Sequence, residues 1–317
     1  MLSIVIPIYN EEENIQLLFD RLVSAGPLWR ESFEVIFVDD GSSDSSVELI
    51  RQIIEKDERF KLIKLSRNFG HQAAITAGLN NAIGDAVIIM DGDLQDPPEE
   101  LPRFLEKWRE GYHVVYAIRA KRKESWFKRM AYYWFYRIMA LISEIDIPLD
   151  SGDFCVMDRA IVDVLKNDFP ERNRFVRGLR AYSGFKQIGI KYERAERSAG
   201  EVKYTFRKLV NLALDGLFDF SLIPLQIAIY LGLTISVLSF LSGFFLIIQR
   251  ITDWKIFGFS PTDVPGMASL GVGIFFLGGI TLMVLGIIGN YVGRIYMEVK
   301  KRPTYIIEEL VGKNGKR

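Results

Sequence analysis

The residues best suited to chemistry form the sequence Asp91-Gly92-Asp93, which follows the apolar run Val87–Met90. On an extended segment residues i and i+2 point to the same side, so the two carboxylates are expected to converge on one site. Paired carboxylates suit Mg²⁺ or Mn²⁺, which also bind phosphate oxygens of a substrate. Gly92 is expected to leave room for a bulky ligand. The alternative is a plain turn, because Asp-Gly is a common turn pair.

A second acidic pair, Asp39-Asp40, follows the apolar run Val35–Val38 in the same way. A carboxylate there can accept hydrogen bonds from a nucleobase or from ribose hydroxyls. The alternative is that it caps the helix predicted to begin near Ser45. Beside the first acidic pair, the nucleotide interpretation is favoured. The turn after the first strand is Pro-Ile-Tyr-Asn-Glu, which is neither a glycine-rich dinucleotide turn nor a P-loop.

Basic residues form two clusters further along the chain. Arginine binds phosphate well through its planar guanidinium group, so two such clusters near a metal–diphosphate site indicate a second phosphate, carried by a lipid. The alternative is that many of these charges only form solvated faces. The first cluster contains Arg119, Lys121, Arg122, Lys128 and Arg129, and the second contains Arg194, Arg197, Lys203, Arg207 and Lys208.

The elements that must position these residues read as alternating strands and helices. Strands are predicted at Ser3–Ile8, Glu34–Asp39, Lys61–Leu65, Ala86–Asp91 and Val114–Ile118, and helices at Glu11–Ser24, Ser45–Lys56 and His71–Ala82. Asn10 and Glu13 are expected to form a capping box for the first helix. This alternation predicts an α/β fold with a mostly parallel sheet covered on both faces. Ligands bind such sheets beyond the carboxyl ends of the strands, where both acidic pairs lie.

Two runs of 30 residues, Phe220–Gln249 and Val264–Gly293, contain no Asp, Glu, Lys or Arg. About 20 apolar residues suffice to cross a bilayer, so two transmembrane helices are predicted, the alternative being two buried helices of a soluble protein. Basic residues outside the two runs outnumber those in the short connecting loop, which places both long ends in the cytoplasm. Ser125–Ser143, rich in aromatic residues and edged by basic ones, is expected to form a helix at the membrane interface, the alternative being a core helix or a subunit contact. Lys203–Phe220 is expected to form an amphipathic helix on the membrane.

Composition excludes several classes of protein. The 40 basic and 40 acidic residues give zero net charge, which argues against a nucleic-acid-binding protein. A single cysteine, Cys155, excludes a disulfide framework and a cysteine-based metal site. Only two histidines, far apart in the sequence, argue against a histidine-rich metal cage.

Together these segments resemble family-2 glycosyltransferases of GT-A fold, which are Rossmann-like. The resemblance is strongest to the polyprenyl-phosphate branch, similar to dolichol-phosphate-mannose synthase, and within it to bacterial bactoprenol glucosyltransferases. The segments that carry it are PIYNEEENI, VDDGSSD, LSRNFGHQAAITAGL, MDGDLQDPPE, SGDFCVMDR, RGLRAYSGFKQ and ERSAGEVKY, spread over most of the chain.

The resemblance implies roles for individual residues. It implies a metal site at Asp91 and Asp93 and an acidic residue, Asp153, facing the acceptor and acting as a base or an orienting group. The implied nucleotide-binding residues are Pro7, Tyr9, Glu11, Asp40, Arg67, Asp91 and Gln95. The implied phosphate- and acceptor-binding residues are Arg119, Arg129, Arg197, Lys203 and Arg207.

The chain departs from the branch at three positions, all on the acceptor side. The branch usually has an arginine after Gly-Asp-Phe, where this chain has Cys155. A tryptophan is common where Tyr182 stands, and a small hydroxyl residue where Val202 stands. These departures bear on how the acceptor is held and leave the reaction class unchanged.

The resemblance implies an inverting, metal-dependent transfer of one sugar from a nucleotide sugar to polyprenyl phosphate at the cytoplasmic face of the inner membrane. UDP-glucose and undecaprenyl phosphate are favoured, with GDP-mannose or a UDP-amino-arabinose derivative as alternative donors. The expected organisation is a catalytic domain at 1–200, a juxtamembrane helix at 201–221, two spans at 222–293 and a basic tail at 294–317. A homo-oligomer is possible.

Two competing functions belong to different classes of protein. A processive polysaccharide synthase is disfavoured, because no Q-x-x-R-W motif occurs and only two apolar runs are long enough to span a membrane. A non-catalytic membrane scaffold or flippase partner is disfavoured by the intact Asp91-Gly92-Asp93 sequence. The glycosyltransferase interpretation is therefore preferred.

Overall fold

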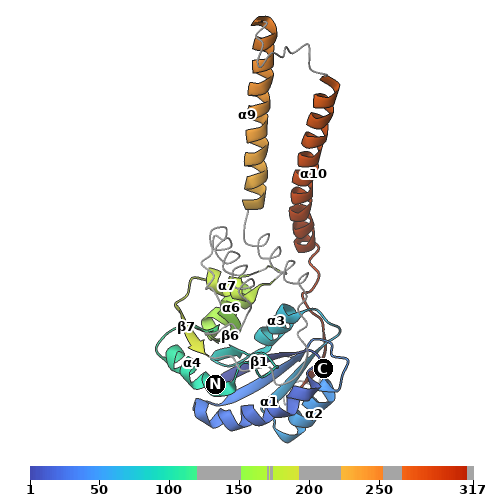
Figure 1. The fold of residues 1–317 in the computed structure, drawn as a ribbon. Helices are drawn as coiled ribbons and strands as arrows, with labels where there is room; N and C mark the ends of the chain where they lie inside the picture. The colour runs from blue at the N-terminus through green and yellow to red at the C-terminus, as the bar shows by residue number, and fades with distance from the viewer. Residues whose placement is uncertain (120–150, 170, 172–173, 193–222, 253–265, 313–317) are drawn as a thin grey trace. The chain divides into compact units, whose positions relative to one another are not determined.

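The computed structural model describes residues 1–119, 151–169, 171, 174–192, 223–252 and 266–312 (Figure 1). They fall into two compact units. The first contains residues 1–141, 145–204 and 302–317, and the second contains 142–144 and 205–301. The predicted aromatic segment Ser125–Ser143 and the predicted amphipathic helix Lys203–Phe220 lie outside the described residues.

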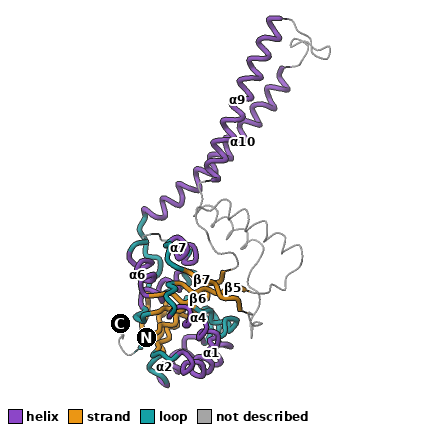
Figure 2. The backbone as a smooth tube through the Cα atoms, turned by 90° about the vertical axis from the view of Figure 1, so that its left-hand side faces the viewer, coloured by secondary structure: helices purple, strands orange, loops and turns teal. Residues whose placement is uncertain are grey.

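The first unit is built on one sheet, drawn in orange in Figure 2. Its described strands follow the order β7-β5-β6-β4-β1-β2-β3-β8. Strands β1, β2, β3 and β4 pair in parallel, as do β5 and β7, whereas β6 is antiparallel to β4 and β5, and β8 is antiparallel to β3. The strands are β1 (Leu2–Ile8), β2 (Phe33–Asp39), β3 (Phe60–Leu65), β4 (Ala86–Ile89), β5 (Val114–Arg119), β6 (Ser151–Asp158), β7 (Gln187–Tyr192) and β8 (Ile307–Val311). The predicted α/β fold with a mostly parallel sheet is confirmed.

Helices cover both faces of this sheet (Figure 1). On one face α1 (Glu12–Ala25), α2 (Ser46–Lys56) and α4 (Leu101–Arg109) bury residues such as Leu18, Ile50 and Phe104 against β1, β2 and β6. On the other face α3 (His71–Asn81), α6 (Arg159–Asn167) and α7 (Val176–Tyr182) form a second core. Each apolar side chain fully buried in these layers contributes about 1.5–3 kcal/mol relative to exposure.

The five predicted strands and three predicted helices are all present, and their ends agree within one or two residues. The exception that matters is β4, which ends at Ile89. Asp91, Gly92 and Asp93 lie in a turn and not on an extended segment. The expectation that strand alternation aims the two carboxylates is therefore wrong, and the turn must position them.

The C-terminal residues return to the sheet. β8 pairs with β3, and the guanidinium of Arg51 on α2 forms a bidentate ion pair with Glu309 on β8. The backbone N–H of Ser66 donates to the carbonyl of Ile306 at 3.0 Å. The range 294–317 was expected to be a basic tail, but its middle is an edge strand. The strand residues, Ile307–Val311, include two glutamates and show no apolar alternation that would predict a strand.

The second unit contains α9 (Ile223–Thr252) and α10 (Gly266–Val299), which contact each other. The described parts of both predicted apolar runs, residues 223–249 and 266–293, are therefore helical. Among the described residues, one stretch, Phe276–Val299, is long and apolar enough to cross a membrane, with a mean hydropathy of 1.7. The apolar stretch of α9, Ala228–Leu241, is shorter.

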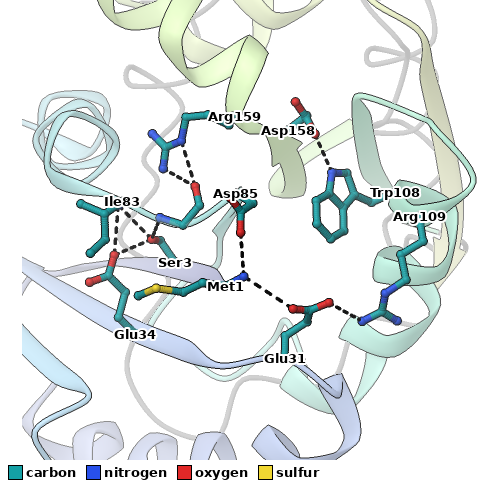
Figure 3. A network of polar contacts seen from close by, with 11 residues as sticks. Met1, Ser3, Glu31, Glu34, Ile83, Asp85, Trp108, Arg109, Asp158 and Arg159 are labelled. Atoms are coloured by element: carbon teal, nitrogen blue, oxygen red, sulfur yellow. Dashed lines mark hydrogen bonds and ion pairs between the residues drawn. The ribbon is translucent and has the colours of Figure 1, made fainter.

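The amino ends of the central strands carry a polar network (Figure 3). Buried Glu34 accepts hydrogen bonds from the hydroxyl of Ser3 at 2.5 Å and from the N–H of Ile83 at 3.1 Å, and it pairs with Lys61. The N-terminal ammonium of Met1 lies 2.8 Å from the carboxylate of Asp85. These contacts join the amino ends of β1, β2 and β3 to the loop before β4.

Candidate active site

The loops after β1 and β2 are joined to each other at the carboxyl ends of the strands. Asn10, with φ 54°, accepts a hydrogen bond from the N–H of Ser43 at 2.8 Å. The N–H of Glu12 donates to Asp44, and the N–H of Ser45 donates back to Glu12. The two helix N-termini therefore cap each other across the loops. The predicted capping box of Asn10 and Glu13 is wrong, because Asn10 serves the neighbouring loop.

Asp40 joins the loop after β3 to the same edge. Its carboxylate accepts hydrogen bonds from the N–H groups of Phe69 at 2.7 Å and Gly70 at 3.0 Å. Burial raises the pKa of Asp40, partly offset by these two donors. Beside it, a Cβ on Gly41 (φ 73°) would lie 2.6 Å from the backbone of Arg67. Asp40 thus helps to shape the rim, by which we mean the loops after β1, β2 and β3 that carry the nucleotide-binding residues expected from the sequence. The two hydrogen bonds use part of the capacity of Asp40 to accept hydrogen bonds from a ligand.

The turn after β4 holds the Asp91-Gly92-Asp93 sequence. Asp93, 9% exposed, accepts a hydrogen bond from the N–H of Gln95 at 3.1 Å, and Leu94 adopts φ 61°. A Cβ on Gly92 would lie 2.6 Å from Cδ1 of Ile8. The turn therefore packs closely against the end of β1. The expectation that Gly92 leaves room for a ligand stays a prediction.

Asp91 is one end of a row of four side chains whose charges alternate in sign. The other three side chains come from three other elements. Nε2 of His71, the first residue of α3, lies 3.6 Å from Oδ1 of Asp91 and 3.6 Å from Oδ2 of Asp153 on β6. The guanidinium of Arg177 on α7 binds Asp153 through two hydrogen bonds, of 3.1 and 3.3 Å. The structure therefore brings Asp91 and Asp153, which are 62 residues apart (153 − 91), to one imidazole.

The electrostatics of this row differ between its two carboxylates. Burial, reinforced by the charges of Asp96, Asp153 and Asp93, raises the pKa of Asp91 to about 6, although His71 opposes the shift. Burial would also raise the pKa of Asp153, but Arg177 and His71 outweigh it and hold that pKa well below its usual range. Burial opposes protonation of His71, yet the two carboxylates raise its pKa.

A divalent cation fits the Asp91 end of the row. The negative charges of Asp96, Asp153 and Asp93 disfavour the ionised form of Asp91, and a bound cation would relieve that repulsion. No group of three or more His, Cys, Asp or Glu side chains within the described ranges is arranged as a metal cage. Mg²⁺ or Mn²⁺ can be held by one or two carboxylates, because these ions complete their coordination with substrate phosphates and water.

The remaining predicted nucleotide-binding residues lie on this rim. Pro7 is buried in β1, and Tyr9 directly after it is 42% exposed. Glu11 precedes α1 and accepts a hydrogen bond from the side chain of Asn14 at 2.6 Å. Arg67 is exposed, and its guanidinium stacks 4.1 Å from the ring centre of Phe69. The loops after β1 and β3 thus present an exposed aromatic ring and an exposed cation at the carboxyl edge of the sheet.

Most of the basic residues expected to bind phosphate lie outside the described residues. Arg119 ends β5, where its backbone pairs with Tyr192. Arg129, Arg197, Lys203 and Arg207 lie outside the described residues. Their roles stay predictions.

The candidate site also contains His71 and Arg177, which the sequence analysis did not identify as site residues. His71 directly follows the loop 66–70, at the sheet edge where ligands bind. That position is the feature by which the sequence could have identified it as a site residue. Arg177 lies in a segment singled out by the family resemblance, but only its contact with Asp153 assigns it a place. Both were missed because their partners are distant in sequence.

Sequence comparisons with known proteins identify the family of this chain. Residues 3–165 match the family described as Glycosyl transferase family 2. The chain is 45% identical to the uncharacterized glycosyltransferase YkcC of Bacillus subtilis, covering 99% of this chain and 95% of that protein. It is 40% identical to a prophage bactoprenol glucosyl transferase homolog of Escherichia coli, covering 98% and 99%. It is 41% identical to the bactoprenol glucosyl transferase of Shigella phage SfII, covering 97% of each. The family match spans about half of the chain and the relatives nearly all of it, and the chain therefore belongs to glycosyl transferase family 2.

Proposed function

We propose that this glycosyltransferase moves one sugar from a nucleotide sugar onto polyprenyl phosphate, with UDP-glucose as the favoured donor. The observation that carries the proposal is the row Asp91–His71–Asp153–Arg177 at the carboxyl edge of the sheet. It offers a carboxylate for a metal-bound diphosphate at one end and a guanidinium near the acceptor side at the other. The names of the relatives from Escherichia coli and Shigella phage SfII, which contain "bactoprenol glucosyl transferase", support a polyprenyl acceptor and a glucosyl donor.

Asp91 and Asp93 would hold Mg²⁺ or Mn²⁺. When bound, the ion supplies Lewis-acid stabilisation of the negative charge that develops on the leaving diphosphate. The chain itself contributes the rigidity of the turn, which Gly92, Leu94 and the hydrogen bond from Gln95 to Asp93 maintain. Tyr9, Glu11, Asp40 and Arg67 line the rim proposed to hold the nucleoside.

The reaction forms a bond between an acceptor phosphate oxygen and the anomeric carbon while the bond from that carbon to the diphosphate breaks. A single displacement inverts the anomeric configuration. A phosphomonoester has a second pKa of about 6, so at neutral pH the attacking oxygen carries no proton that must be removed. Asp153, whose pKa is held well below its usual range, is a weak base. We assign it an orienting role toward the acceptor side, fixed by Arg177 and His71.

The chain path supports two membrane crossings. Residues before 205 and after 301 belong to the same unit, and β8 is hydrogen-bonded into the sheet of that unit. A segment whose two ends belong to one folded unit crosses a bilayer an even number of times. If Phe276–Val299 crosses, the apolar run of α9 crosses too. We therefore propose two spans within 222–293, a juxtamembrane helix at 201–221 and a catalytic unit on the cytoplasmic face of the inner membrane.

A donor panel tests the proposal. Purified full-length protein in detergent is given short-chain polyprenyl phosphate, Mn²⁺ or Mg²⁺, and UDP-glucose, UDP-galactose, GDP-mannose or a UDP-amino-arabinose derivative in turn, and release of nucleoside diphosphate is followed. We expect release that requires both the acceptor and the ion, with UDP-glucose fastest. If another donor were fastest, only the proposed sugar would be corrected, and the proposed reaction class would stand. Absence of release with every donor, together with unchanged cellular function of Asp91→Asn, would favour the non-catalytic scaffold.

A further inference from the structure

His71 lies between two carboxylates and can serve only one of them fully. Its Nε2 is 3.6 Å from Oδ1 of Asp91 and 3.6 Å from Oδ2 of Asp153. Both neighbours are carboxylate oxygens, which accept hydrogen bonds, so Nε2 must carry a proton. A hydrogen bond from such an N–H group spans about 2.7–3.2 Å, so neither contact is a full hydrogen bond. One N–H group is therefore shared between two acceptors.

The two carboxylates differ in what else they hold. Asp91 belongs to the turn proposed to bind a divalent cation, and a cation there would repel an N–H group that points at the same oxygen. Asp153 is fixed by two hydrogen bonds from Arg177, and its side chain is only 13% exposed. A second acceptor for His71 is therefore already in place when Asp91 takes the cation.

The imidazole of His71 has room to change partner. Its side chain is 45% exposed, although it belongs to the first residue of α3. The backbone just before it is held, because the N–H of Gly70 donates to Asp40 at 3.0 Å. Rotation of the side chain, without movement of the helix, is therefore sufficient to bring Nε2 within hydrogen-bonding distance of Asp153.

We propose that His71 is a positioning residue that passes from Asp91 to Asp153 when a divalent cation and its diphosphate bind the acidic turn. The inference rests on the proposed function and assigns His71 a part in that site. Without ligand, His71 partly neutralises Asp91. With the cation bound, His71 hydrogen-bonds Asp153 together with Arg177. Donor binding thus fixes Asp153, the group to which we assign the orientation of the acceptor.

The competing role for His71 is that of a metal ligand. A nitrogen that binds a metal ion carries no proton, whereas the positioning role keeps the proton on Nε2. Mg²⁺ and Mn²⁺ prefer oxygen ligands, and imidazole suits other metals better. The positioning role is therefore favoured, and the two roles predict opposite results in the experiments below.

Nuclear magnetic resonance of the histidine rings tests the movement. The chain has two histidines, so full-length protein in detergent, labelled with ¹⁵N and ¹³C in histidine, gives two sets of ring signals. His113 directly precedes β5 at the amino ends of the parallel strands, away from the site, and is the internal control. His113→Asn assigns the signals. Mg²⁺ with UDP should shift the signals of His71, leave those of His113 in place and leave the proton on Nε2.

Mn²⁺ affinity, measured by electron paramagnetic resonance, tests the competition for Asp91. His71→Ala removes the competing group, so Mn²⁺ should bind about 2- to 5-fold more tightly, the range of a partly exposed charge pair. His113→Asn should bind Mn²⁺ as wild type does. Asp153→Asn removes the charge of the second acceptor and should weaken Mn²⁺ binding more when His71 is present than in the His71→Ala background. This double-mutant cycle separates the coupling from the general loss of a negative charge.

Three outcomes would overturn the inference. The first is loss of the Nε2 proton on Mg²⁺ binding, or weaker Mn²⁺ binding by folded His71→Ala, which would make His71 a metal ligand. The second is a set of His71 signals that does not move when the ion binds, or additive effects of His71→Ala and Asp153→Asn. The third is no binding of Mn²⁺ by wild type. These measurements need no turnover, so the role of His71 can fail while the donor panel shows transfer, and transfer can fail while His71 responds.

Discussion

At the scale of single residues, the site is a row of charges in which each group sets the state of its neighbour. His71 stands between Asp91 and Asp153, and Arg177 anchors the far end. Burial and nearby carboxylates raise the pKa of Asp91, whereas the pKa of Asp153 is held well below its usual range, so Asp153 stays ionised. One carboxylate is therefore prepared to receive a cation, and the other serves as a fixed negative group. Two predictions separate these roles.

The first prediction concerns pH and Mn²⁺. Because the pKa of Asp91 is raised to about 6, protons compete with the cation below that pH, and Mn²⁺ affinity should fall by about tenfold per pH unit. Above about pH 7 the affinity should level off. Titration of the protein with Mn²⁺ by electron paramagnetic resonance at pH 5, 6, 7 and 8 measures this. Affinity that is constant across the range would contradict the role of Asp91.

The second prediction concerns Asp153→Asn. Asparagine keeps one acceptor oxygen but removes the charge that Arg177 and His71 hold, so turnover should fall about 10- to 100-fold. The acid limb of the pH–rate profile should persist in this variant, because Asp91 sets it and Asp153 in wild type is already ionised throughout. Steady-state rates between pH 5 and 9 provide the check. Disappearance of the acid limb in this variant would show that Asp153 titrates as a base.

At the scale of elements, three loops form a single rim because backbone donors of one loop are satisfied by side chains of the next. Asp40 on the second loop binds the amides of Phe69 and Gly70 on the third, and Asn10 on the first binds the amide of Ser43. Gly41 allows the second and third loops to touch.

A third prediction follows for Gly41→Ala. The new Cβ would lie 2.6 Å from backbone atoms of Arg67 and Asn68, so the third loop must move. Gly111→Ala is the matched control, because Gly111 also has positive φ (89°) but nothing lies within 4 Å of the position of its Cβ. Gly41→Ala should lower the free energy of unfolding by about 1–3 kcal/mol more than the control and raise KM for the donor. Urea unfolding followed by tryptophan fluorescence measures the first effect, and equal losses in the two variants would refute it.

How much of the molecule the sequence predicts also depends on the element. β1 to β5 and α1 to α3 were predictable, because short apolar runs alternate with amphipathic stretches. β8 was not predictable, because its five residues include two glutamates. Only its pairing with β3 defines it as a strand. The aspartates of the site were visible as motifs after strands. His71 and Arg177 were not, because only folding brings α3, β6 and α7 together.

At the scale of the whole molecule, the chain leaves the catalytic unit before α9 and returns to it after α10. The last strand, β8, closes the edge of the sheet, with Glu309 paired to Arg51 and Tyr305 accepting a hydrogen bond from Asn80. The apolar segment therefore begins and ends on the same side of any membrane it enters. The loop between the two apolar runs must lie on the other side if both of them cross.

The fourth prediction tests this topology by cysteine labelling in intact bacterial cells. In a Cys155→Ser background, Ser260→Cys in the connecting loop should react with a membrane-impermeant maleimide. Ser24→Cys, exposed on α1, should react only after the cells are permeabilised. Labelling of Ser24→Cys in intact cells, or protection of Ser260→Cys, would contradict two crossings with a cytoplasmic catalytic unit.

The central claim is that the acidic turn after β4 holds the divalent ion on which sugar transfer depends, and Asp93→Asn tests it most directly. Asparagine can still accept the hydrogen bond from Gln95, so the turn should keep its shape while it loses a metal-binding charge. The measurement is transfer of labelled glucose from UDP-glucose to polyprenyl phosphate, with Mn²⁺ and after chelation, in wild type and variant of equal melting temperature. We predict that chelation abolishes wild-type transfer and that the variant loses at least about 100-fold with Mn²⁺ present. Transfer by a folded Asp93→Asn protein at near the wild-type rate would contradict the account.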